Sequence, residues 1–160
     1  MTIAVGDKIP LVTLTRMTDD GPAEVTTTEL FERKKIVVFG LPGAFTPTCS
    51  ASHLPGYVVK SDDLFAKGVD GIACVSVNDA FVMDAWGKRH NAEDRVMMIA
   101  DGNADFATAV GLELDLRPRG MGVRSQRYAM IVDDGVVTHL NVEAPAKFEV
   151  SDAETILGLL

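Results

Sequence analysis

The residues best suited to chemistry are gathered in one short segment, Leu41-Pro42-Gly43-Ala44-Phe45-Thr46-Pro47-Thr48-Cys49. A threonine followed by a proline, as in Thr46-Pro47, is typical of the N-cap and first position of a helix, and this spacing makes Cys49 the third helical residue. A thiol in the first helical turn lies beside unpaired N–H groups at the positive end of the helix dipole, which stabilise a thiolate. A small buried hydrophobic residue is the alternative, but it would need neither the cap nor the proline. We therefore expect Cys49 to be a reactive thiol.

A histidine follows Cys49 by four residues, the spacing of neighbours on one helix face. A Cys-His pair of nucleophile and base, as used in acyl transfer, is therefore one interpretation of Cys49 and His53. Against it, the sequence offers no evident third group to orient the imidazole, and a histidine before Leu54-Pro55 is more often packed or hydrogen-bonded. Pro55 should remove one helical hydrogen bond and kink the helix after these residues.

The second cysteine, Cys74, lies in the apolar run 71–77, which has the composition of a buried strand. Two cysteines are too few for a disulfide framework, and in a reducing compartment a disulfide between them would be transient. Neither belongs to a CxxC or HxxxH group, so we expect no structural metal site. Cys74 is either an inert core thiol, which we favour, or a thiol that resolves an oxidised Cys49.

Alternating strand and helix signals surround these residues. Apolar runs at residues 36–39 and 71–77 predict two central strands, and the segment 46–67 between them is long enough for a crossover helix, which implies parallel pairing. Further along the chain we expect a helix over 79–89, a strand over 96–99 and a helix over 103–110. This alternation predicts an α/β fold.

The C-terminal part of the chain has a different pattern. Residues 128–132 and 136–140 flank Asp133-Asp134-Gly135, a turn sequence suited to a hairpin, so the last two strands should be antiparallel. Ser151 is expected to cap a final helix, with Glu154 at the capping-box position. A central mixed β-sheet flanked by helices, in one domain over residues 1–160, accommodates all of these elements.

Composition argues against several classes of function. The chain has 160 residues, and its formal net charge of -8 repels a nucleic-acid backbone. Its longest weakly polar stretch, residues 36–49, is broken by two prolines and is shorter than the roughly 20 residues of a membrane span. The first ten residues have neither the basic and apolar regions of a signal peptide nor the composition of a transit peptide. We expect a cytoplasmic protein with neither nucleic acid nor membrane as a partner.

The pattern Pro42-x-x-x-Thr46-x-x-Cys49 resembles the active-site signature of the peroxiredoxins, thiol peroxidases with a thioredoxin-like fold. The longer block 40–49, together with residues 53–57, is similar to the type II, or peroxiredoxin-five, subfamily. Further similar segments, which extend the resemblance over almost the whole chain, are residues 76–82, 111–115, 124–129 and 132–135. Thr46 stands where thioredoxin-like redox proteins carry the first cysteine of a CxxC motif, so a local dithiol exchange is excluded.

The resemblance implies a role for each residue of the signature. Cys49 would attack one peroxide oxygen as a thiolate and become a sulfenic acid. Thr46 would hold the peroxide through its hydroxyl, and Pro42 would form an apolar wall that limits water. Arg127 would supply a permanent positive charge to the thiolate and to the departing oxygen. Hydrogen peroxide and organic hydroperoxides would be reduced to water and alcohols without a metal or other cofactor.

Four arginines, Arg117, Arg119, Arg124 and Arg127, lie close together in this acidic chain. We expect Arg117 and Arg119 to lie on a solvated loop face. The resemblance assigns Arg124 and Arg127 to the site. Arg124 is a candidate supporting residue that helps to dock an anionic thiol such as glutathione.

Members of the subfamily differ in how the oxidised cysteine is reduced. The animal kind has a resolving cysteine near the C-terminus, and residues 146–160 contain none. The spacing of Cys49 and Cys74 resembles the plant and bacterial type II kind, whose members are recycled by glutathione and glutaredoxin and in some cases by thioredoxin. The resemblance also implies a homodimer and a role in antioxidant defence and cell redox homeostasis. A redox sensor that uses Cys49 oxidation as a signal and a Cys-His hydrolase are the alternatives from other classes.

Overall fold

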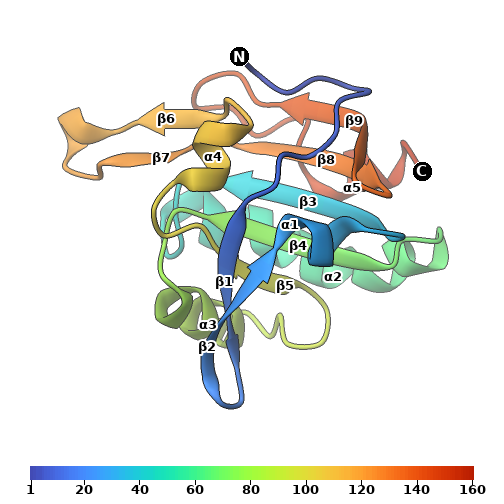
Figure 1. Cartoon of the computed structure of the whole chain (residues 1–160), viewed down its shortest axis with the longest axis horizontal. Coiled ribbons are helices and arrows are strands. Elements are labelled where there is room, and N and C mark those ends of the chain that lie inside the picture. The colour runs from blue at the N-terminus through green and yellow to red at the C-terminus, as the bar shows by residue number, and fades with distance from the viewer.

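Seven strands form one mixed sheet in the computed structural model, which describes residues 1–160 (Figure 1). The strand order is β2-β1-β5-β4-β3-β8-β9. The bounds are β1 Thr13–Thr18, β2 Gly21–Thr26, β3 Lys35–Leu41, β4 Gly71–Ser76, β5 Met97–Ala100, β8 Tyr128–Asp133 and β9 Val136–Val142. β4 pairs in parallel with β3 and β5, and the other neighbours are antiparallel. The α/β architecture with a mixed sheet, expected from the sequence, is confirmed.

Five α-helices pack around this sheet. They are α1 Thr27–Phe31, α2 Leu54–Ala66, α3 Ala80–Arg89, α4 Asp105–Ala109 and α5 Ala153–Leu157. A π-helical turn, Cys49–His53, leads directly into α2. A separate two-stranded ribbon of β6 (Glu113–Asp115) and β7 (Val123–Ser125) projects from the molecule on the side where the arrowhead of β3 ends (Figure 1). None of the helices is long and apolar enough to cross a lipid bilayer.

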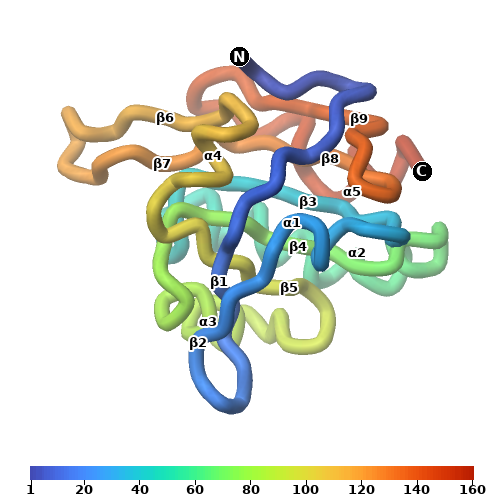
Figure 2. The backbone as a smooth tube through the Cα atoms, viewed as in Figure 1, coloured from blue at the N-terminus to red at the C-terminus, as the bar shows by residue number.

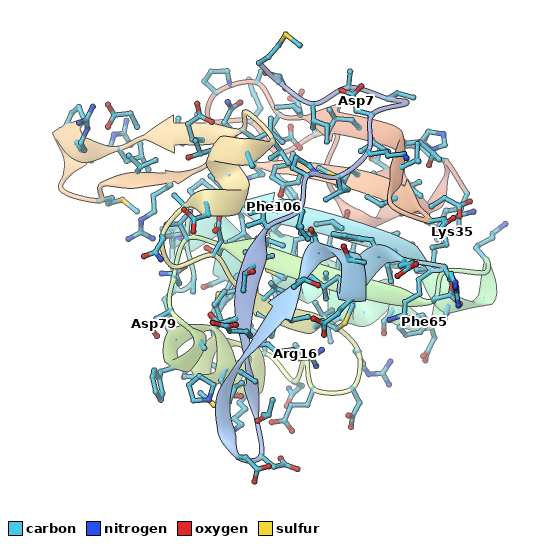
Figure 3. The ribbon with its side chains drawn as sticks, viewed as in Figure 1. Asp7, Arg16, Lys35, Phe65, Asp79 and Phe106 are labelled. Atoms are coloured by element: carbon cyan, nitrogen blue, oxygen red, sulfur yellow. The ribbon has the colours of Figure 1, made fainter.

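Two apolar cores lie on the two faces of the sheet. Val37 and Phe39 of β3 belong to the core that also holds Cys49, Cys74 and side chains of α2 and α3. Alternate residues of β3 belong to the second core, together with Phe106 of α4 (Figure 3). Successive side chains of a strand point to opposite faces, so a strand buried on both faces has a continuous apolar run. The apolar run at residues 36–39, which predicts β3 from the sequence, follows from this burial on both faces.

The N-terminal segment follows the outer edge of the sheet before β1 begins (Figure 2). The Gly6 N–H donates to the Val137 carbonyl and the Ile9 N–H to the Gly135 carbonyl, each at 2.8 Å. Lys8 forms an isolated antiparallel bridge with Val136. The segment therefore covers part of the open edge of β9, which would otherwise present unpaired backbone groups.

Most predicted elements are present within two residues of their expected bounds. Four further features, β1, β2, α1 and the β6–β7 ribbon, were not predicted from the sequence. The cap of the last helix was assigned to the wrong residue: Asp152, not Ser151, is the N-cap of α5, and its side chain accepts from the Thr155 N–H at 3.1 Å. Ser151 is fully buried and makes its hydrogen bonds elsewhere.

Both segments of chemical interest follow the carboxyl ends of parallel strands. β3 ends immediately before the turn that carries Pro42 and Thr46, and β4 ends just before Asp79, the N-cap of α3. In Figure 3, Asp79 marks this end of the sheet and Lys35 marks the opposite end. Open α/β sheets bind ligands outside the carboxyl ends of their strands, so the fold brings the predicted site residues to a suitable place.

Candidate active site

The turn after β3 is fixed to the end of β4. The side-chain oxygen of Asn78 accepts one hydrogen bond from the Ala44 N–H (3.0 Å) and another from the Ser76 hydroxyl (2.6 Å). The next residue, Phe45, has a left-handed φ of 64°, which is unusual for a bulky side chain. Such a conformation persists only where the surroundings hold the chain in place, and the Asn78 contacts do so here.

Thr46 precedes the helical segment, which begins at Pro47. The Thr46 carbonyl accepts a helical hydrogen bond from the Ser50 N–H at 2.9 Å. Its hydroxyl donates to the Gly43 carbonyl at 2.7 Å. Cys49 is therefore the third helical residue, as the sequence predicts. Because the hydroxyl proton of Thr46 is committed to Gly43, this hydroxyl presents its lone pairs to a bound molecule as an acceptor.

Cys49 starts a π-helical turn that ends at His53. The Leu54 N–H donates to the Cys49 carbonyl, five residues back, and Pro55 follows at the N-terminus of α2. The irregularity predicted at Pro55 thus takes the form of a widened turn. The indole N–H of Trp86 on α3 donates to the Ser50 hydroxyl at 3.0 Å and ties the turn to α3.

The Cys49 thiol is 0 % exposed and accepts a hydrogen bond from a charged donor. Arg127, the residue before β8, donates from Nη2 to Sγ of Cys49 at 3.2 Å. A guanidinium is charged at every accessible pH, so Sγ of Cys49 has a permanently positive hydrogen-bond partner. The antiparallel pairing of β8 with β3 brings these two residues together across 78 positions of sequence.

His53 is hydrogen-bonded to Arg127 rather than to Cys49. Its Nδ1 accepts from Nη1 of Arg127 at 2.8 Å, because a guanidinium only donates. A neutral imidazole then carries its proton on Nε2, which donates to the Ser151 carbonyl at 3.1 Å. Burial and the neighbouring Arg127 lower the pKa of His53 to about 3, so the ring is neutral near pH 7. Both nitrogens are occupied, and the interpretation of Cys49 and His53 as a nucleophile and its base is wrong.

Three residues that support His53 and Arg127 were not predicted from the sequence. The Phe148 ring lies 5.7 Å from the Arg127 guanidinium and 5.0 Å from the His53 ring. Ser151 supplies the carbonyl beside His53, and Glu143 binds Ser151. All three belong to the segment between β9 and α5. No local motif marks them, because the contacts form only where this loop folds back on itself.

Arg124 of β7 is attached to the turn that carries Pro42. Its Nη1 donates to the Pro42 carbonyl at 3.3 Å and its Nε to the Met121 carbonyl at 2.8 Å. Gly43 makes room for this arrangement, since an added Cβ there would lie 2.6 Å from Nη1 of Arg124. The structure therefore brings Arg124 beside the predicted site, in contact with the main chain of Pro42 and not with Cys49.

The rest of the arginine cluster faces solvent. Arg117 and Arg119 are exposed in the turn of the β6–β7 ribbon. Arg117 forms an ion pair with Asp115 of the same ribbon at 2.7 Å. This agrees with the solvated loop face that the sequence predicts for these two residues.

Cys74 occupies the middle of β4, opposite Phe39 of β3. Its thiol is 0 % exposed, and burial, with a smaller contribution from Cys49, raises its pKa well above the ordinary value. A protonated thiol is a weak nucleophile. The Cys74 backbone is paired on both sides, with β3 and with β5. An approach of the two sulfur atoms would therefore require movement of the turn around Cys49.

A cleft of about 830 Å³ lies away from this site. It lies at the amino ends of the parallel strands and is lined by Ile36, Gly71 and charged residues of both signs; Figure 3 labels two of its lining residues, Arg16 and Phe65. None of the predicted site residues lines it. No group of three or more His, Cys, Asp or Glu side chains is placed to hold a metal ion. The polar contacts of Cys49, not the size of a cavity, mark the candidate site.

The wider similarity of the chain decides its family. Residues 4–157 match the Redoxin family. The chain is 52 % identical over 164 residues to Peroxiredoxin-2E-2, chloroplastic, of Oryza sativa subsp. japonica, an alignment that covers 99 % of this chain and 73 % of that protein. It is 46 % identical to Peroxiredoxin-2B of Arabidopsis thaliana over 99 % of this chain and 98 % of that protein. The chain belongs to the type II peroxiredoxins.

A solved structure extends this similarity to the fold. The crystal structure of reduced Prx3 from Vibrio vulnificus in complex with hydrogen peroxide is 59 % identical to this peroxiredoxin, with a TM-score of 0.95 and 99 % of each chain covered. The family resemblance found in the sequence is thereby confirmed. This peroxiredoxin is an antioxidant thiol peroxidase with a thioredoxin-like fold.

Proposed function

We propose that this peroxiredoxin reduces hydrogen peroxide and alkyl hydroperoxides with Cys49 as the peroxidatic residue, and that glutathione and glutaredoxin regenerate the thiol. The observation that carries the proposal is the 3.2 Å contact between Nη2 of Arg127 and Sγ of Cys49 at the start of a helical segment. Helix N–H groups and a guanidinium both stabilise a thiolate, which is the nucleophilic form of cysteine.

In the first step the Cys49 thiolate attacks the protonated oxygen of the peroxide. An S–O bond forms, the O–O bond breaks, and the sulfur loses two electrons to become a sulfenic acid. The other oxygen leaves as hydroxide or alkoxide and takes a proton from solvent, which gives water or an alcohol. Arg127, beside the sulfur, stabilises the negative charge as it moves from sulfur to the leaving oxygen.

Thr46 and Pro42 orient the peroxide in this proposal. The Thr46 hydroxyl donates to Gly43, so it accepts a hydrogen bond from the peroxide O–H. Pro42 is half-buried in the same turn and has no N–H group to hold water, which suits an apolar wall. Both residues follow β3 directly, and the Asn78 contacts with Ala44 hold the turn between them.

Reduction by an external thiol is supported by the surroundings of Cys74, which is buried, protonated and fixed in a central strand. The glutathione thiolate attacks the sulfenic sulfur of Cys49, an S–S bond forms, and the hydroxyl leaves as water. A thiolate of glutaredoxin or of a second glutathione then attacks the mixed disulfide and restores Cys49. Arg124, bound to the Pro42 carbonyl, offers a positive charge for a glutathione carboxylate.

Intact mass spectrometry tests both parts of the proposal. Reduced wild type, Cys49→Ser and Cys74→Ala are treated with one equivalent of hydrogen peroxide and then with glutathione. Wild type and Cys74→Ala should gain one oxygen and then exchange it for a glutathione adduct, whereas Cys49→Ser should gain neither. An intramolecular disulfide that is lost in Cys74→Ala would overturn glutathione recycling and make thioredoxin the expected reductant. An unreactive Cys49 would overturn the peroxidatic assignment.

A homodimer formed through the loops near the active site is also part of the proposal. Phe45 and Phe81 are 51 % and 66 % exposed, and Phe45 lies next to Trp86 of the helix that carries Phe81. Exposed aromatic side chains of this kind are typical of protein interfaces. Sedimentation should give a dimer for wild type and a monomer for Phe81→Ser. Val59→Ser, at a 77 % exposed position of α2, is the control and should stay dimeric.

A further inference from the structure

We propose that Glu143 is a positioning residue for the peroxidase reaction. It holds Ser151 through the N–H and the hydroxyl of that residue, and the Ser151 carbonyl keeps His53 in the one tautomer that can orient Arg127 toward Cys49. This inference rests on the proposed role of Cys49 as the peroxidatic residue. Glu143 directly follows β9 and has no part in the sequence motifs of the site.

The Glu143 carboxylate is an anchor for the loop that leads into α5. Oε2 accepts from the Ser151 hydroxyl (2.7 Å) and from the N–H groups of Ser151 (2.8 Å) and Val150 (2.9 Å). The Glu149 N–H is shared between both carboxylate oxygens, each at 2.9 Å. Glu143 is 8 % exposed, and none of the three ion pairs of the chain involves it.

The charge of Glu143 is kept by these hydrogen bonds. Burial alone would raise its pKa, but the bonds from the Ser151 hydroxyl and from the three N–H groups outweigh burial, and the pKa lies below the ordinary value. The carboxylate is therefore ionised at neutral pH. An ionised carboxylate only accepts hydrogen bonds, which suits a position surrounded by donors.

The carbonyl of Ser151 accepts two hydrogen bonds from buried side chains. His53 donates from Nε2 at 3.1 Å, and the Tyr57 hydroxyl donates at 2.8 Å. The Tyr57 ring is stacked on Phe39 of β3, with the ring centres 4.1 Å apart. His53, Tyr57 and Ser151 are each 0 % exposed. The carbonyl thus lies at a fixed point between the core and the imidazole.

This carbonyl decides the tautomer of His53. A neutral imidazole has one N–H, and Ser151 accepts it at Nε2, so the lone pair remains at Nδ1 for the guanidinium of Arg127. If the carbonyl moved away, the Nε2–H would lose its acceptor and the other tautomer would gain population. An Nδ1–H would then face the donors of Arg127, and Arg127 would lose the contact that orients it toward Cys49.

The same loop restrains Arg127 from a second direction. Phe148 lies between Glu143 and Ser151 in sequence, and its ring is 5.7 Å from the guanidinium carbon of Arg127. A cation over an aromatic ring is attracted by the negative face of the ring. Loss of the Glu143 anchor would therefore release both the imidazole and the aromatic contacts of Arg127.

Four variants test the positioning role. Glu143→Ala removes the anchor, and Glu143→Asp keeps the charge but withdraws it from the loop. In Glu143→Gln the amide oxygen can take the place of Oε2, which accepts most of the bonds. Asn141→Ala is the matched control, because Asn141 Nδ2 donates to the Val150 carbonyl (2.8 Å) and tethers the same loop without a hydrogen bond to Ser151.

The first measurement is the rate of peroxide reduction. The fluorescence of Trp86, the single tryptophan, reports this rate. Glu143→Ala should be slower by about tenfold to hundredfold, which is less than the loss of a direct charge-stabilising donor. Glu143→Asp should be slower by a smaller factor, and it carries the test if Glu143→Ala does not fold. Glu143→Gln should recover most of the rate, and Asn141→Ala should stay within about twofold of wild type.

The second measurement is the tautomer of His53, from the nitrogen chemical shifts of its ring by NMR. Wild type, Glu143→Gln and Asn141→Ala should show the Nε2–H form, and Glu143→Asp a mixture of both forms. An unchanged rate and tautomer in Glu143→Asp and Glu143→Ala would overturn the inference, as would an equal loss of rate in Asn141→Ala. If Cys49→Ser still reduced peroxide, the proposed function itself would fail, which is a different outcome.

Discussion

The two cysteines lie in the same core and are equally buried, yet their surroundings differ in kind. Cys49 starts a helical turn at the carboxyl end of β3 and accepts a hydrogen bond from Arg127. Cys74 lies in the middle of the neighbouring strand β4, where burial raises the pKa of its thiol. Both are 0 % exposed. Exposure therefore does not separate the two thiols; the position relative to a strand end and the presence of a charged donor do.

Replacement of each thiol is the strongest test of this contrast. Cys49→Ser should lower the rate of peroxide reduction by a factor of about a thousand or more, because the proposed nucleophile is lost. Cys74→Ala should keep the rate. Mixing each reduced variant with one equivalent of peroxide and following the loss of peroxide with time gives the comparison directly. Circular dichroism of both variants controls for folding, and comparable rates in the two would show that the thiols do not differ.

Removal of the charged donor, Arg127, should have the next largest effect on the difference in reactivity between Cys49 and Cys74. Arg127→Gln should slow peroxide reduction by about a hundredfold to a thousandfold, the usual loss on removing one transition-state donor. Arg127→Lys should fall between wild type and Arg127→Gln, because an ammonium keeps the charge but lacks the planar fork that reaches both His53 and Cys49. Stopped-flow fluorescence of Trp86 measures all three. A rate for Arg127→Gln equal to that of wild type would show that the helix start alone activates Cys49.

Because His53, beside Cys49, is buried and neutral, the free energy of unfolding should fall in acid. Its pKa is about 3 in the folded protein, against an ordinary 6.5, so below pH 6.5 the unfolded chain binds the extra proton and the free energy of unfolding falls. From about pH 6.5 to about pH 5 wild type should lose about 1.5 kcal/mol more than His53→Asn, which does not titrate. Urea unfolding of both proteins at the two pH values measures the difference.

The comparison with His53→Asn isolates one group. His90 also has a lowered pKa, caused by burial and by Arg89, but it is present in both proteins and its effect cancels. Parallel slopes of stability against pH in the two proteins would mean that His53 is protonated in the folded state. The Nδ1 contact with Arg127 could not then exist, since a protonated imidazole has no acceptor.

The part of the site that could be predicted from the sequence is the part whose signals are local. Thr46-Pro47 marked the helix start, and Cys49 followed from it by counting; Arg127 and Pro42 came only from the family resemblance. The strands β1 and β2 were missed because both have exposed polar residues and lie at one edge of the sheet, where little apolar periodicity is required.

The misassigned cap has a physical explanation that also bears on the site. Ser151 and Asp152 are adjacent residues of the type that caps helices, and sequence alone does not rank them. Asp152 takes the cap, and the Ser151 hydroxyl and N–H are used by Glu143 eight residues earlier. Spacing in the sequence does not report this pairing, because it depends on the path of the loop between them.

The smallest expected effects are those of replacing Cys74. They test whether the second thiol contributes only to the stability of the core. Cys74→Ala should lower the free energy of unfolding by about 1 kcal/mol, the order of removing one methylene-sized group from a core. Glutaredoxin-dependent turnover should stay within about twofold of wild type, since a protonated thiol in the middle of β4 takes no part in the cycle. Denaturant unfolding and steady-state turnover measure the two quantities. A turnover that fell much further than the peroxide step would instead give Cys74 a role in reduction, and the chemistry of the site would then need both thiols.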